Sequence, residues 1–309
     1  MKPNSYNRGS NIKYLTFKPD AGAFNNKRVA FESLVLFALV TGRTLVLPPD
    51  KYFSFGDYYS MEDLSRVVHF LPAKEFFKRK ELETSFLSTD SACGICGRIK
   101  KKLARAGGGL DKTEYLEAIK RMPDTHVTKW IPCEGDDTLF FPRDDSPTCD
   151  SSCLRDASKH RRSKHIEYDE VMQKASVFHW DEPRILVAFA AMIAFQDPAE
   201  ERLAHLTMRN HVHLNGYLFD MAAKVVHEIL QKAGKYHAMH VRRGDFQYKQ
   251  SKFKGVEAVY MNVQHLFEEG DTIYIATDEK DRSYFDPLRK HYKLLFFSDF
   301  PEVMCFIGL

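Results

Sequence analysis

The apolar residues of this chain fall into short runs separated by longer helical patterns. The first run, Tyr14–Phe17, predicts a strand, and a loop over residues 18–25 leads from it into an apolar helix over 26–41 that ends at Gly42. A second short strand is predicted at Thr44–Leu47. A strand, a helix and a strand in close succession form a βαβ unit, which implies a parallel sheet covered by helices.

The same alternation returns in the second half of the chain. Residues 185–189 predict a strand and residues 190–211 a mostly helical segment. The elements predicted after these are helix 219–233, strand 236–241, helix 256–268, strand 272–276, helix 281–291 and strand 293–297. The two series predict an α/β protein with two Rossmann-like domains, over residues 1–210 and 211–309. Such halves bind ligands at the carboxyl ends of their strands.

The stretch over residues 81–165 does not follow this alternation. It combines charge runs, three consecutive glycines and most of the cysteines, and it predicts an irregular, largely exposed insertion with a helix or two. Its charge runs are typical of solvated faces. The cysteines in it are Cys93, Cys96, Cys133, Cys149 and Cys153, whose spacing leaves zinc half-sites, disulfides and free thiols open.

Composition and charge narrow the class of protein. Of the 309 residues, 44% are hydrophobic and 28% are charged, which is typical of a globular protein. The net charge of +3 does not predict a nucleic-acid or membrane-surface partner. No run approaches the roughly 18 apolar residues of a membrane span. The polar residues 1–12 lack the apolar core of a secretory signal, which indicates a cytosolic protein, a processed form or a fragment.

The most informative segment follows the predicted strand 236–241. It reads HVRRGD at residues 240–245, so two guanidinium groups, an imidazole and a carboxylate lie where an open α/β sheet binds its ligand. Guanidinium groups bind phosphate oxygens two at a time and stay charged. Neighbouring side chains diverge at a strand exit, so we expect one arginine to face the ligand and the other to pack on an acidic neighbour. The alternative is a salt bridge that only caps the loop.

A second segment lies between the first strand and the first helix. It reads GAFNNKR at residues 22–28, and a glycine-containing loop that opens a helix presents backbone N–H groups and a positive dipole end to a phosphate. The segment matches neither the dinucleotide-binding nor the P-loop pattern, so nicotinamide and P-loop chemistry are not supported. The alternative is a plain helix N-cap by Asn25.

A third segment, IATDE at residues 275–279, also lies at a predicted strand exit. Acidic residues there suit a ribose, a base edge, a metal or the cap of the next helix, and capping is favoured on local grounds. No D-x-D triplet occurs in the chain, which argues against a Mn²⁺-dependent sugar-nucleotide site.

In this order, the three segments resemble those of the GDP-fucose-dependent fucosyltransferase superfamily, and most of all its plant-like O-fucosyltransferase family. The first loop departs from the family's G-G-F-N-N-Q-R at Ala23 and Lys27, whereas the H-x-R-R-G-D and A-T-D-E motifs match throughout. The resemblance implies a GT-B fold in which two Rossmann-like domains face a cleft. Family members continue beyond the region of Ser298, so the second domain is expected to be incomplete at its C-terminus.

The resemblance also implies a function. It is that of an inverting, metal-independent O-fucosyltransferase, which transfers fucose from GDP-fucose to a hydroxyl of a protein or glycan acceptor. Arg242 is the implied catalytic residue, which stabilises the leaving diphosphate. The implied donor-binding residues are Gly22, Phe24, Asn25, Asn26, His240, Asp245 and Asp278. No cofactor besides the donor substrate is implied, and the implied location is the lumen of the endoplasmic reticulum or Golgi.

Two alternatives stay open. One is a related GT-B glycosyltransferase with another donor or acceptor, such as a rhamnosyl- or α1,2-fucosyltransferase. The first loop of the α1,2 enzymes is closer to G-G-L-G-N-Q, so residues 24–26 argue against them. The other is an inactive fragment that binds a nucleotide or glycan. A base for the acceptor hydroxyl is not evident, and the carboxylate nearest to the first loop is Asp20.

Overall fold

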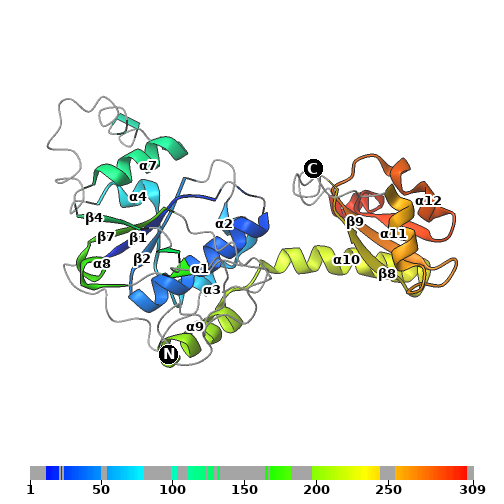
Figure 1. Ribbon diagram of the computed structural model, residues 1–309, viewed down its shortest axis with the longest axis horizontal. Coiled ribbons are helices and arrows are strands. Elements are labelled where there is room, and N and C mark those ends of the chain that lie inside the picture. The colour runs from blue at the N-terminus through cyan, green and yellow to red at the C-terminus, as the bar shows by residue number, and fades with distance from the viewer. Residues whose placement is uncertain are drawn as a thin grey trace. The chain divides into compact units, whose positions relative to one another are not determined.

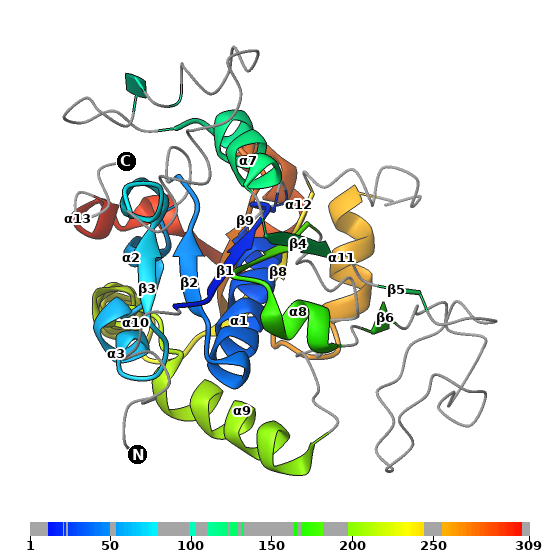
Figure 2. The same ribbon diagram turned by 90° about the vertical axis from the view of Figure 1, so that its left-hand side faces the viewer.

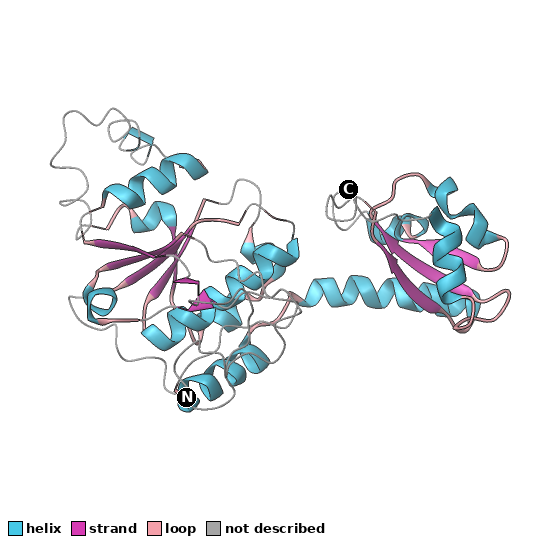
Figure 3. Cartoon of the chain, viewed as in Figure 1, coloured by secondary structure: helices cyan, strands magenta, loops and turns pink. Residues whose placement is uncertain are grey.

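A computed structural model shows two compact units, Met1–Leu214 and Asn215–Leu309, each built on a parallel sheet (Figures 1 and 3). The residues it describes are 12–20, 22, 24–49, 54–79, 99, 101–102, 110–122, 124–128, 131–132, 164–165, 168–181, 197–243 and 255–304. The predicted strand 185–189, Asp245 and the cysteines lie outside them. The division falls a few residues after the predicted domain boundary.

The main sheet of the first unit has the strand order β3-β2-β1-β7-β4, and all neighbouring strands are parallel. Figure 2 labels β3, β2, β1 and β4 in this order. The strands are β1 (Tyr14–Phe17), β2 (Thr44–Leu47), β3 (Phe70–Pro72), β4 (Thr125–Thr128) and β7 (Val177–Trp180). A small antiparallel pair joins β5 (Ile131–Pro132) to β6 (Lys164–His165). The parallel sheet predicted from the first βαβ unit is confirmed.

Helices cover both faces of this sheet. They are α1 (Phe24–Thr41), α2 (Phe55–Tyr58), α3 (Met61–Ser65), α4 (Ala73–Phe76), α7 (Lys112–Arg121), α8 (Glu170–Lys174) and α9 (Pro198–His211). One core cluster joins α1 to Leu15, Phe178 and Trp180, and the other joins α4 and α7 to Tyr14 and Val177. Alternate residues of a strand point to opposite faces, so β1 and β7 contribute to both clusters.

The stretch over residues 81–165 was expected to be an irregular, exposed insertion, and for part of it this is wrong. Tyr115, Ala118 and Ile119 of α7 are fully buried, and β4 pairs with β7 along its whole length. A capping box at Asp111 and Glu114 begins α7. This part of the stretch therefore belongs to the sheet and the core of the first unit, because its apolar helix face needs the sheet to cover it.

Arg43, which interrupts an apolar stretch of the sequence, is almost completely buried. Its guanidinium donates to the carbonyl oxygens of Tyr14 at 3.1 Å and Ala175 at 3.0 Å, and to the hydroxyl of Tyr168 at 3.0 Å. These bonds satisfy the buried cation through backbone and hydroxyl oxygens. Arg43 thereby ties the start of β2 to β1 and to the chain that enters β7.

The second unit holds a three-stranded parallel sheet in the order β10-β9-β8. Its elements are α10 (Gly216–Ala233), β8 (His237–Val241), α11 (Gly255–Val263), β9 (Thr272–Thr277), the 3₁₀ helix η5 (Arg282–Phe285), α12 (Asp286–Arg289), β10 (Lys293–Phe296), the 3₁₀ helix η6 (Phe297–Asp299) and α13 (Pro301–Met304). One face of the sheet packs on α10, and the other packs on α11 and α12.

The strands of this unit agree closely with those predicted, and two helices differ. The helix expected over residues 256–268 ends at Val263. The single helix expected over residues 281–291 is a 3₁₀ turn followed by one short α-helical turn that contains Pro287. Proline has no backbone N–H to donate to the preceding turn and is tolerated in the first turn of a helix, so a new helical turn begins at Asp286, directly before Pro287. None of the described helices combines the length and apolar character needed to cross a membrane.

Candidate functional site

The carboxyl ends of β8 and β9 lie side by side in the second unit. The register pairs His240 with Ala276 and Val241 with Thr277, so the HVRRGD and ATDE segments leave the sheet at the same edge. The sequence placed each segment at a strand exit, and the structure brings the two together.

Arg243 is held at this edge by three contacts. Its Nε lies 3.2 Å from Oε2 of Glu279, and its guanidinium carbon lies 3.7 Å from the centre of the Tyr284 ring. Its backbone N–H donates to Oδ1 of Asp278 at 2.6 Å. The expectation that one of the two arginines packs on an acidic neighbour is confirmed, and this arginine is the second of the pair.

The turn that follows β9 is fixed by local hydrogen bonds. The N–H of Glu279 donates to Oγ1 of Thr277 at 3.0 Å, and Oε1 of Glu279 accepts the N–H of Asp281 at 2.9 Å. Burial raises the pKa of the Tyr284 hydroxyl, and the neighbouring Arg243 cation opposes that rise. The turn thus holds the Glu279 carboxylate in place, and Arg243 contacts this carboxylate and the Tyr284 ring without any ligand.

His240 and Arg242 flank a buried valine at the end of β8, and both are exposed. Arg242 lies between the last residue of the strand and the anchored Arg243, so its backbone is restrained on both sides. Asp278 was predicted to lie near the donor, and its carboxylate binds the backbone of Arg243. The other acidic residue predicted for this site, Asp245, lies outside the part of the chain that the structure describes.

The other predicted donor-binding residues lie at the start of α1 in the first unit. Oδ1 of Asp20 accepts the N–H of Gly22 at 2.5 Å and turns the chain toward the helix. Because α1 begins at Phe24, Asn25 and Asn26 lie in its first turn, and Asn25 is not the N-cap that the alternative reading expected. The Phe24 ring packs against that of Tyr58, with the centroids 4.7 Å apart.

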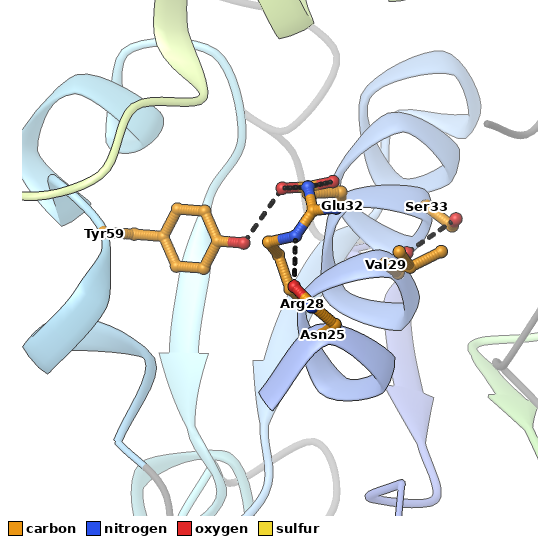
Figure 4. A network of polar contacts seen from close by, with 6 residues as sticks. All are labelled: Asn25, Arg28, Val29, Glu32, Ser33 and Tyr59. Carbon is orange, nitrogen blue, oxygen red and sulfur yellow. Dashed lines mark hydrogen bonds and ion pairs between the residues drawn. The ribbon is translucent and has the colours of Figure 1, made fainter. Parts of the chain in front are cut away.

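A polar network joins this first turn to the chain after α2 (Figure 4). Nη1 of Arg28 lies 2.9 Å from both carboxylate oxygens of Glu32, and Nε of Arg28 donates to Oδ1 of Asn25 at 3.4 Å. The Tyr59 hydroxyl donates to Glu32 at 3.0 Å, and burial raises the pKa of this hydroxyl. The network orients Asn25 and balances the charge of Arg28 within the protein.

A further polar group lies at the carboxyl ends of β1 and β7. Oγ1 of Thr16 lies 2.9 Å from Nδ1 of the fully buried His179, and Nε2 of His179 lies 4.0 Å from Oδ1 of Asp181. Nζ of Lys18 lies 3.8 Å from the same carboxylate oxygen. Burial lowers the pKa of His179 to about 4, as do Lys120 and Lys18 to a smaller extent, while Asp181 opposes the change.

The sequence implied no metal at the donor site and left zinc open at the cysteines, which lie outside the described residues. Within the described ranges, no three His, Cys, Asp or Glu side chains come together in a group that could hold a metal ion. The carboxyl edge of the second sheet carries Arg242 and Arg243, and the Arg243 side chain pairs with Glu279.

A sequence model of the GDP-fucose protein O-fucosyltransferase family matches residues 14–303 of this chain. The chain belongs to this family. It is therefore a glycosyltransferase of the fucosyltransferase type, and its α/β fold, with a parallel sheet in each unit, is of the class expected from the sequence. No protein of curated function matches the sequence itself.

Solved structures of other fucosyltransferases are similar to this O-fucosyltransferase at low identity. POFUT1 in complex with GDP is 12% identical, with 94% of this chain and 87% of that chain covered and a TM-score of 0.40. A variant of Arabidopsis thaliana FUT1 in complex with GDP is 13% identical, with 92% and 59% covered and a TM-score of 0.43. NodZ from Bradyrhizobium is 12% identical, with 93% and 79% covered and a TM-score of 0.37.

Sequence reasoning missed several polar residues of this O-fucosyltransferase. Tyr284 lies beneath Arg243, and it was hidden inside a segment predicted as one regular helix. His179 and Asp181 went unnoticed because β7 was not predicted. The signal was present: a run of apolar residues at 177–180 contains one histidine and is followed at once by an aspartate.

Proposed function

We propose that this chain transfers fucose from GDP-fucose to a hydroxyl group of a protein or glycan acceptor, with inversion at the anomeric carbon. The observation that carries the proposal is the preorganised exit of β8. There Arg243 is bound to Glu279, Tyr284 and Asp278, and the neighbouring Arg242 is thereby set at the edge of the sheet. The family match supports the choice of donor.

Arg242 supplies the charge that the reaction needs. When the bond between the anomeric carbon and the β-phosphate oxygen breaks, negative charge develops on the diphosphate. A fixed guanidinium binds this charge more strongly in the transition state than in the ground state, and only such a difference accelerates the step. The anchoring of Arg243 limits how far Arg242 moves to reach it.

The remaining donor-binding residues are proposed at two places in the chain. His240 and Asp245 are proposed to act at the β8 exit, and Gly22, Phe24, Asn25 and Asn26 at the start of α1. A helix start stabilises an anion through its unpaired N–H groups, and the amide groups of the two asparagines add donors and acceptors there. Asp278 acts indirectly, through the backbone of Arg243.

The arginine replaces the divalent cation that other glycosyltransferases use to hold a diphosphate, so the proposed reaction needs no metal. We also propose a location in the lumen of the endoplasmic reticulum or Golgi, which rests on family resemblance. Protease protection of the tagged chain in intact microsomes tests the location, and digestion without detergent would count against it.

The donor is tested by thermal shift of the whole chain with GDP, UDP and GTP. Stabilisation by GDP, together with GDP release from GDP-fucose, supports the proposal. Preference for UDP would indicate a related glycosyltransferase with another donor, and no response to any nucleotide would indicate a protein that has lost the activity. NMR spectroscopy of the fucosylated product then tests inversion, because a retained anomeric configuration contradicts it.

A further inference from the structure

The strand order of the first unit reverses between β1 and β7. From β1 the chain runs through β2 to β3 on one side, whereas β7 and β4 lie on the other side. In open α/β sheets, a ligand crevice forms beyond the carboxyl ends of the strands at such a reversal. The loop from β1 to α1, which holds the proposed donor contacts of this unit, leaves the sheet at the same point.

Four polar residues share one side of the sheet at this reversal. The register pairs Thr16 with His179, and the backbone N–H of Lys18 donates to the carbonyl of Trp180 at 3.0 Å. Because side chains alternate along a strand, Lys18 follows Thr16 and Asp181 follows His179 on the same side. The ends of the two strands thus carry a lysine and an aspartate beyond a buried threonine and histidine.

The surroundings of the buried His179 indicate a role for Asp181. His179 is fully buried, and among the described residues its Nε2 has no hydrogen-bond partner, although Oδ1 of Asp181 lies only 4.0 Å away. The Thr16 hydroxyl lies within reach of both Nδ1 of His179, at 2.9 Å, and the carbonyl oxygen of Phe178, at 3.4 Å. When the hydroxyl donates to Nδ1, a neutral imidazole carries its hydrogen on Nε2, on the side of the Asp181 carboxylate. The charged groups that face it are Asp181, Lys18 and Lys120.

The Asp181 side chain is 15% exposed, so a ligand can reach it while most of it is withdrawn from water. Nζ of Lys18 lies 3.8 Å from Oδ1 of Asp181, so a cation faces this carboxylate, and a carboxylate can accept a proton. A carboxylate such as that of Asp181 accepts a hydrogen bond from a neutral hydroxyl and can then take up its proton.

We infer that Asp181 is the general base for the acceptor hydroxyl, with His179 and Lys18 as positioning residues. The inference rests on the proposed function. As the acceptor oxygen bonds to the anomeric carbon of fucose, its O–H bond breaks and the proton goes to the Asp181 carboxylate. The bond from the anomeric carbon to the β-phosphate oxygen breaks at the same time, and its electron pair leaves with GDP.

The test uses the full chain, GDP-fucose and two small nucleophiles that stand in for the acceptor. Water must lose a proton when it attacks, whereas azide has none to lose, so only the reaction with water needs a base. GDP release is measured with each nucleophile for wild type, Asp181→Asn and Asp181→Glu. Glu62→Gln is the control, since it removes a carboxylate that is 88% exposed on α3. Melting temperature and the thermal shift with GDP check folding and donor binding.

For Asp181→Asn, the rate with water is expected to fall by about 10²-fold or more, which is the usual contribution of a general base. The rate with azide is expected to stay near that of wild type, and Asp181→Glu to recover part of the rate with water. An equal fall with both nucleophiles in a folded variant that binds GDP would overturn the inference, and so would no fall at all. If wild type released no GDP with either nucleophile, the proposed function itself would fail.

Discussion

The contacts of Arg243 lead to opposite expectations for the two adjacent arginines. Replacing Arg243 with alanine removes the ion pair with Glu279 and the contact with the Tyr284 ring. It keeps the hydrogen bond from the backbone N–H to Asp278, because that bond involves no side-chain atom of Arg243. The turn should therefore survive, with a lower free energy of unfolding.

The size of this loss in the free energy of unfolding follows from how exposed the Arg243 and Glu279 side chains are. The side chains of Arg243 and Glu279 are 34% and 21% exposed, so their ion pair contributes about 0.5–1 kcal/mol. A partly exposed cation over a ring contributes about the same. Arg243→Ala is expected to lower the free energy of unfolding by about 1–2 kcal/mol and to leave GDP release within about tenfold of wild type, since tenfold corresponds to about 1.4 kcal/mol.

Arg242→Ala is expected to lower the rate of GDP release strongly. The loss of one preorganised donor to a developing charge costs about 3–4 kcal/mol in the transition state, or about 10²–10³ in rate. Arg242→Lys should recover little of this, because lysine keeps the charge but lacks the planar fork.

Urea unfolding and initial rates of GDP release from GDP-fucose measure the two quantities in the same preparations. The matched control is Arg289→Ala, since Arg289 also pairs with a carboxylate, that of Asp286, and lies over the ring of Phe296, but on α12. Its rate should equal that of wild type. If Arg243→Ala abolished GDP release in stable protein while Arg242→Ala did not, the assignment of the two arginines would be wrong.

Three further expectations concern metal, packing and pH. GDP release should survive EDTA, because Arg242 supplies the positive charge; complete loss that Mn²⁺ restores would contradict this. Arg43→Met should lower the free energy of unfolding by about 2–4 kcal/mol, since it leaves buried carbonyl oxygens without donors, whereas the exposed Arg66→Met should change it by under about 0.5 kcal/mol. His179 has a folded-state pKa near 4, below the 6.5 of the free side chain. Its contribution to stability is therefore fully present above about pH 6.5 and is lost as the pH falls toward 4. Urea unfolding at about pH 7 and about pH 5 should show this loss in wild type and a smaller one in His179→Asn.

Local patterns were sufficient for the strands that enclose the predicted sites. β1 and β2 have the predicted bounds, since each is a short apolar run between clear breaks. The exits of β8 and β9 were equally predictable, because the charged motifs follow directly on apolar strands. The packing of the second arginine on an acid followed from strand geometry, although which acid and which ring it contacts did not.

The first unit was harder to read from the sequence. β4 has one apolar residue among its four, β7 contains a histidine, and their pairing joins segments far apart in the chain. Strands with such interrupted apolar patterns are stabilised by their neighbours in the sheet and carry little signal of their own. The part of the supposed insertion that holds α7 and β4 was misassigned for the same reason.

By itself, the sequence determined the α/β class, the two domains and the motifs of a GDP-fucose-dependent enzyme, because these depend on periodicity and on residues adjacent in the chain. Only the tertiary structure decided which side chains meet. It buried Arg43 among carbonyl oxygens, placed Tyr284 under Arg243, and brought Thr16 and Lys18 to His179 and Asp181 from more than half the chain away. Contacts of this kind depend on sheet pairing between distant segments, and no local pattern of residues encodes them.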